Sequence, residues 1–225
     1  MTRRFLVALI FGLAGAAILI GLGIWQMQRL AWKEAILAEI TARIAAEPVA
    51  LPPPPVTETE ALRYLPVTVS GRFTGEALRV LVSRKEQGPG VRVIEVLETP
   101  DGRRVMVDRG FLPDARKDEP LTASQIALTG NLHWPDEVDS FTPPPDPKAG
   151  LWFARDVPAM AAALNAEPVL VIAKTDTGDG IEPMPADTSG IPNDHLGYAI
   201  QWFGMATVWL GMTAYLLWRI RRRTV

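Results

Sequence analysis

The sequence predicts a membrane protein in which two transmembrane helices flank an α+β outer domain made mostly of antiparallel sheet, which could close into a barrel. Two charge-free runs, residues 5–28 and residues 196–218, are each long enough to cross the hydrocarbon core of a bilayer. Between them, short apolar runs alternate with turn residues, as is typical of strands.

The first apolar run, residues 5–28, follows a short tail at residues 1–4. A cleaved signal peptide is the alternative, but its apolar core is usually only about 7–15 residues long, and no A-x-A site ends this run. We therefore expect an uncleaved transmembrane helix. Apolar residues then recur at spacings of three and four, so the helix should continue to near Glu47, before a proline-rich linker that completes residues 29–55.

The outer domain, residues 56–194, contains several segments with strand patterns and one alanine-rich helical segment. A Pro-Asp-Gly turn at residues 100–102 predicts that two of the strands form a hairpin. The expected strands are residues 66–73, 78–82, 91–97, 104–112, 126–132 and 169–175, and the expected helix is residues 157–165.

The second apolar run, residues 196–218, is followed by a basic tail at residues 219–225. The two tails hold six arginines, and without them 17 basic residues face 25 acidic ones. Basic residues at both ends predict a multi-pass protein of the inner (plasma) membrane with both termini cytoplasmic and residues 56–194 in the periplasm. Its environment is then the lipid bilayer, and its acidic body argues against nucleic-acid binding.

Several kinds of site are excluded by the composition. The chain has no cysteine, which rules out disulfides, thiolate metal sites and covalent c-type haem attachment. It contains neither a G-x-S-x-G nor an H-E-x-x-H motif. We therefore predict no catalytic turnover.

His195, one of only two histidines, stands immediately before the second apolar run. An imidazole at a membrane boundary is either a headgroup-level anchor or a ligand for a membrane-borne molecule. His195, Trp202 and Trp209 lie seven residues apart, with Tyr198 close to the same stripe.

A second stripe on this run is formed by Gly197, Gly204 and Gly211. Small residues allow close helix packing, so we expect these glycines to pack on the first span. The aromatic stripe would then point partly away from that contact, which would leave Trp209 available to a flat apolar ligand or a partner helix. The expected packing partners are Ala8, Gly12 and Ala16.

The first span ends in the motif GIWQMQRLAWK at residues 23–33. Trp25, Arg29 and Trp32 share one helix face. They are either an interfacial belt that fixes depth in the membrane or a site for anionic groups, because arginine pairs with carboxylates.

These motifs together resemble the surfeit locus protein 1 family, and the resemblance covers nearly the whole chain. It implies an assembly factor for haem-copper cytochrome c oxidase that holds haem a and delivers it to subunit I. Haem a synthase is a further partner to consider. The motifs lie at residues 23–33, 64–73, 108–110, 151–156 and 192–203.

The resemblance also implies which residues hold the haem. His195 maps onto the favoured iron ligand of the family. Arg29, with Lys33, would meet the propionates. The polar cluster of the first span maps onto Trp25, Gln26 and Arg29, and the residues that would flank the macrocycle are Tyr198 and Trp202.

Two positions depart from the family pattern, since Gly197 stands where glutamine is expected and Asp194 where asparagine is usual. The first departure removes a hydrogen-bond partner near the imidazole. His133 could complete a bis-histidine site, although a surface or core position is the simpler reading of that residue.

Two other functions compete with the haem carrier. A cofactor-free membrane scaffold would stabilise oxidase assembly intermediates without binding haem. An outer-facing receptor or enzyme would need a polar pocket in the outer domain, and the sequence offers no nucleophile-base pair or metal cluster for one.

Overall fold

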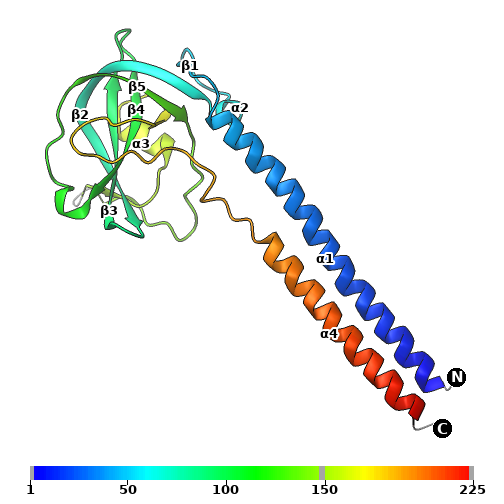
Figure 1. The fold of residues 1–225 in the computed structure, drawn as a ribbon. Helices are drawn as coiled ribbons and strands as arrows, with labels where there is room; N and C mark the ends of the chain where they lie inside the picture. The colour runs from blue at the N-terminus through cyan, green and yellow to red at the C-terminus, as the bar shows by residue number, and fades with distance from the viewer. Residues whose placement is uncertain (1–2, 147–149, 223–225) are drawn as a thin grey trace. The chain divides into compact units, whose positions relative to one another are not determined.

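The computed structural model describes residues 3–146 and 150–222 (Figure 1). It divides into a helical unit, Met1–Glu39 with Thr188–Val225, and a sheet unit, Ile40–Asp187. The ends of the two predicted tails, residues 1–2 and 223–225, lie outside the described residues.

The helical unit consists of α4 (His195–Arg222) and most of α1 (Arg3–Ile44). Within the described ranges, α1 alone is long and apolar enough to cross a membrane, with a mean hydropathy of 2.7 over its most apolar stretch. Glycines, threonines and Gln201 dilute the apolar character of α4. One membrane-crossing helix is thus supported, and the second stays a prediction.

The two helices lie side by side and antiparallel, so that the Arg3 end of α1 and the Arg222 end of α4 lie at the same end of the unit (Figure 1). Beyond the apolar run, α1 continues without a break to Ile44, close to the predicted end at Glu47. The Ile44 carbonyl accepts hydrogen bonds from Asn131 Nδ2 (3.3 Å) and Lys174 Nζ (2.7 Å), which satisfy a carbonyl that the helix end leaves free.

The sheet unit is a mixed sheet of seven strands in the order β1-β2-β3-β4-β7-β5, with β6 on β2. β5 also pairs with β2, so the pairings form a closed cycle. Four pairings are antiparallel as expected, whereas the short strands β1 and β6 run parallel to β2. β7 also runs parallel to β4, and a long crossover that includes a helix connects these two strands. The strands are β1 (Val49–Ala50), β2 (Pro66–Arg84), β3 (Gly88–Glu98), β4 (Arg104–Pro113), β5 (Gln125–Leu132), β6 (Leu151–Trp152) and β7 (Leu170–Ala173).

β2 corrects the prediction of two separate strands at residues 66–73 and 78–82. It is one strand of 19 residues whose register against β3 shifts between Phe73 and Ala77. Gly75, at φ +84°, lies in this irregular stretch. The first half of β2 pairs with β5 and the second half with β3, so one irregular strand pairs with two neighbours.

The predicted hairpin is confirmed, because β3 and β4 pair antiparallel with Glu98 opposite Arg104. The amide of Gly102, at φ +82°, donates to the Thr99 carbonyl at 2.9 Å. Both faces of these strands are largely buried, and consecutive residues such as 105–107 all belong to the core. Its largest fully buried apolar side chains include Phe73, Ile94, Leu97, Met106, Leu132, Met160 and Leu170.

The predicted alanine-rich helix is α3 (Val157–Leu164). Asp156 caps its start by accepting from the Ala159 amide at 3.1 Å, and Asn165 ends it in the left-handed conformation. Sequence patterns did not predict the shortest elements, which are β1, β6, α2 (Thr59–Leu62) and η1 (Asp114–Arg116).

Candidate functional site

Small residues hold the helical unit together. On α4, Ala199 and Ala206 are 1% and 3% exposed and lie seven residues apart on the face turned to α1. On α1, Gly12, Ala16 and Gly23 are buried, and a Cβ added to either glycine would collide with a side chain of α4. Such residues allow two backbones to approach closely, which favours helix pairing in an apolar medium.

The predicted packing of the glycine stripe on α1 is wrong. Gly197, Gly204 and Gly211 are exposed, and a Cβ added to any of them would meet no atom within 4 Å. The alanines occupy the contact face instead, and the glycines lie on a different face of α4. Of the expected partners on α1, Gly12 and Ala16 are buried as predicted.

Trp209 also lies differently from the prediction, because it faces α1 rather than away from it. Its Nε1–H donates to the Gly12 carbonyl at 2.8 Å, and its ring covers Gly15, where a Cβ would collide with it. The Phe11 ring lies 5.4 Å away at an interplanar angle of 53°. The indole is therefore part of the helix contact.

The central feature of the site is a hydrogen bond between the two helices. Nδ1 of His195, at the start of α4, lies 2.8 Å from Oε1 of Gln26, which is 8% exposed on α1. A carbonyl oxygen only accepts, so Nδ1 carries the proton and donates. This contact orients the ring, and in the Nδ1–H tautomer the Nε2 atom keeps its lone pair. Such a donated bond is typical of a metal-binding histidine.

The other predicted site residues lie within about two helical turns of this pair along α1 or α4 and differ in exposure. Tyr198 is 51% exposed one turn beyond His195, and Trp202 is half-buried one turn further. On α1, Trp25 is 50% exposed. The guanidinium of Arg29 lies 4.2 Å from the ring centroid of Trp32, so this cation stacks on its own helix.

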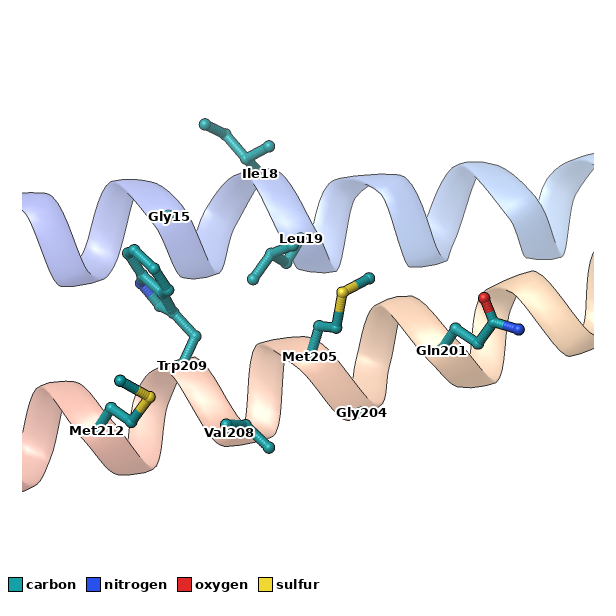
Figure 2. Close-up of a pocket in the computed structure, with 9 residues that line it drawn as sticks. All are labelled: Gly15, Ile18, Leu19, Gln201, Gly204, Met205, Val208, Trp209 and Met212. Atoms are coloured by element: carbon teal, nitrogen blue, oxygen red, sulfur yellow. The ribbon is translucent and has the colours of Figure 1, made fainter.

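An apolar groove of about 730 Å³ runs along the helix pair, away from His195 (Figure 2). Figure 2 shows Gln201 at one end of the row of α4 residues and Met212 at the other, with Trp209 and Leu19 reaching across between the helices. No charged residue lines it. Its lining residues are Gly15, Ile18 and Leu19 from α1, and Gln201, Gly204, Met205, Val208, Trp209 and Met212 from α4.

The sheet unit contains a buried ionic network on the Asp-Arg-Gly motif. Asp108 pairs with Arg92 (Nε to Oδ2, 2.8 Å) and Arg155 (Nη1 to Oδ2, 3.2 Å). Arg109, fully buried, pairs with Glu95, whose pKa burial raises in spite of that cation. Each of these buried charges has a partner of opposite charge, as expected for buried ionic groups in a structural network.

His133 belongs to the sheet unit and lies beside this network. Its ring stacks on Tyr64, with centroids 4.9 Å apart. Burial lowers its pKa to about 4, and the charges of Arg155 and Arg63 act in the same direction. His133 is therefore a neutral, packed side chain in the folded protein at neutral pH.

Sequence reasoning named His195 and Gln26 but did not pair them, and it missed the groove. The missed signal is the spacing of Ala199, Trp202, Ala206 and Trp209, which alternate small and large at steps of three and four. That spacing is typical of a helix–helix seam. It would have placed the glycines outside the contact.

Comparison with known proteins adds family information to this geometry. The model of the SURF1 family matches residues 13–207. Surfeit locus protein 1 of Rattus norvegicus is 30% identical over 206 residues, which cover 81% of this chain and 67% of that protein. The Homo sapiens protein of the same name is 30% identical and the match covers 81% and 68%. A SURF1-like protein of Monosiga brevicollis is 30% identical over 87% of this chain and 82% of its own length.

Proposed function

The chain belongs to the SURF1 family, and on this premise we propose that it is an assembly factor for haem-copper cytochrome c oxidase. It holds haem a in the membrane and delivers it to subunit I, with haem a synthase as the source of the haem. In this role it is a carrier without catalytic turnover.

One observation carries the proposal, namely the hydrogen bond from His195 to Gln26. A haem iron needs an axial ligand with a free lone pair, and a ring held by its other nitrogen supplies one in a fixed direction. Gln26 provides the partner that the glycine at position 197 cannot.

The residues present fit a haem. Tyr198 and Trp202 offer aromatic surface beside the imidazole, and Trp25 offers more from α1. Arg29, with Lys33, supplies positive charge for the propionates. When bound, the haem supplies a Lewis-acidic iron and a flat apolar macrocycle. Among the described residues no group of three or more metal-ligating side chains gathers, but a haem needs only axial ligands from the protein because its porphyrin holds the iron.

The carrier role also needs release of the cargo. Within the helical unit, His195 is the only histidine, so it would be the only histidine there to bind the iron. One such bond would be easier to exchange for a ligand of the recipient than two.

We further propose that α4 crosses the membrane as a second span. Residues 196–218 carry no charge, and arginines follow at positions 219, 221 and 222. The Arg3 end of α1 lies at the same end of the helical unit (Figure 1). Basic residues stay on the cytoplasmic side, so both termini are cytoplasmic and the sheet unit is periplasmic, at the inner membrane.

The test is an optical spectrum of the full-length protein, purified from a host that makes haem a, beside His195→Ala and His133→Gln variants. We expect stoichiometric haem a in the wild type and in His133→Gln, and loss or a spectral shift in His195→Ala. Haem bound equally by all three would remove His195 from the site. Absence of haem from every protein, with oxidase assembly intact, would favour the cofactor-free scaffold.

A further inference from the structure

We infer that the apolar groove between α1 and α4 binds the isoprenoid tail of the haem, and that it makes the protein prefer farnesylated haems to haem b. This inference rests on the proposed function. It assigns a role in selectivity to residues that contact neither the iron nor the propionates.

The groove has the shape and chemistry that a tail requires. Its α4 lining extends from Gln201 to Met212, about 16 Å along the helix at 1.5 Å per residue. Its volume of about 730 Å³ and its uncharged lining suit a long hydrocarbon chain. Two methionines, Met205 and Met212, contribute flexible surface that adapts to a branched chain.

Gly204 and Trp209 shape the groove in different ways. Gly204 leaves open space where any side chain would project, as no atom lies within 4 Å of a Cβ added there. Trp209 is fixed in place by its bond to the Gly12 carbonyl, so this wall is rigid. The open space at Gly204 and the fixed ring of Trp209 are present before the ligand binds, which lowers the free-energy cost of binding.

The groove begins within one to two helical turns of His195 along the axis of α4. Gln201, at the end nearest His195, lies six residues beyond it, about 9 Å along the axis. Tyr198 lies on the stretch between them. Gln201 is also the one polar side chain of the α4 lining.

Gln201 distinguishes this tail from an ordinary lipid chain. The farnesyl group of haem a and haem o is attached through a carbon that carries a hydroxyl group, next to the macrocycle. The exposed amide of Gln201 can both donate to and accept from that hydroxyl, whereas the ester carbonyl that heads a lipid acyl chain can only accept. The farnesyl tail is therefore the occupant that matches both this amide and the length of the groove.

The experiment compares haem o with haem b, because these two differ in the hydroxyethylfarnesyl group alone. Each is titrated into the full-length protein in detergent and followed by absorbance. Burial of part of the tail predicts that wild type binds haem o at least about tenfold more tightly than haem b.

Three variants locate the preference. Gly204→Leu fills the groove and should reduce the ratio to within about threefold, with haem b affinity unchanged. Gly211→Leu is the matched control, since it is the same change at an equally open position on α4 outside the groove lining. It should keep the wild-type ratio. Gln201→Leu should weaken haem o several-fold and leave haem b unaffected.

The experiment distinguishes failure of the groove inference from failure of the proposed function. Equal, His195-dependent affinity of wild type for haem o and haem b would overturn the groove inference and leave the haem carrier standing; this is the result expected if a membrane lipid fills the groove. An unchanged preference in Gly204→Leu would also overturn it. If no protein binds either haem, the proposed function fails and the inference fails with it.

Discussion

At the residue scale, the two histidines show how the surroundings decide what an imidazole can do. His195 donates through Nδ1 to Gln26 and keeps Nε2 free, whereas the Nδ1 of His133 is buried without a partner in a packed stack with Tyr64. The first arrangement presents a lone pair for binding. In the second arrangement burial favours the neutral ring, so protonation of His133 would destabilise the fold.

Replacement of Gln26 tests the first arrangement. Gln26→Leu removes the acceptor that orients the imidazole, and loss of such a partner costs about 10–100-fold in affinity at metal sites. We expect a weakening of haem affinity in that range, measured by absorbance titration. Gln28→Leu is the control, because Gln28 is exposed two residues further along α1. An equal loss in both variants would contradict an orienting role for Gln26.

His133 predicts a pH dependence of stability in the sheet unit. Its pKa is about 4 in the folded state against 6.5 when free, so the unfolded chain binds a proton first as the pH falls. The free energy of unfolding should therefore drop between pH 6.5 and pH 4, by no more than about 3 kcal/mol. The contribution of neutral His133 to the free energy of unfolding is fully present above pH 6.5.

His133→Gln should flatten this part of the profile, as measured by denaturant unfolding at pH 6.5, 5.5 and 4.5. The pKa values of Glu137 and Asp179 are lowered, so the stability that these carboxylates contribute is lost mainly at lower pH. The raised pKa of buried Glu95 acts with the opposite sign as the pH falls, so the difference between the variant and the wild type is what isolates His133. A variant as pH-sensitive as the wild type between pH 6.5 and 4.5 would assign the effect to other groups.

At the element scale, α1 and α4 pair through alternating small and large side chains. Ala199 and Ala206 admit the backbone of α1, and Trp209 fills the space over Gly15. Among the exposed glycines of α4, Gly204 lies on another face and lines part of the groove. One helix thus carries a packing face and a binding face side by side.

Ala206→Leu tests the packing face. Ala206 is 3% exposed, so a larger side chain must push the helices apart, at a cost of about 1–3 kcal/mol. We expect a lower melting temperature of the helical unit and weaker crosslinking between cysteines placed on α1 and α4. Gly211→Leu, in open space, should change neither. Equal behaviour of the two variants would mean that the alanines do not form the contact.

At the scale of the whole molecule, the chain consists of a helical unit, which includes the one apolar helix long enough to cross a membrane among the described residues, and a mixed sheet that contains buried ion pairs. α1 ends in carbonyl contacts with Asn131 and Lys174 of the sheet unit. The Asp-Arg-Gly motif serves the interior of that unit, where Asp108 joins two arginines. The chemistry of the proposed site lies on the helices instead.

The absence of cysteine makes the membrane topology directly testable, because any introduced thiol is the only one. Ser140→Cys, in the sheet unit, should react with a membrane-impermeant maleimide in cells whose outer membrane has been permeabilised. Thr224→Cys, in the basic tail, should react only after the inner membrane is broken. Labelling of Thr224→Cys before that step would show that α4 does not cross the membrane.

The sequence by itself determined the long first helix, the hairpin, α3 and most strands, and it singled out His195 as the candidate ligand. These follow from local rules, since charge-free runs, alternation and turn residues act over a few neighbours. Only the tertiary structure decided that β2 is one bent strand, that alanines rather than glycines face α1, and that Gln26 orients His195. Each of these depends on which face of a segment meets a partner distant in the chain, and spacing along one segment leaves several faces open to that contact.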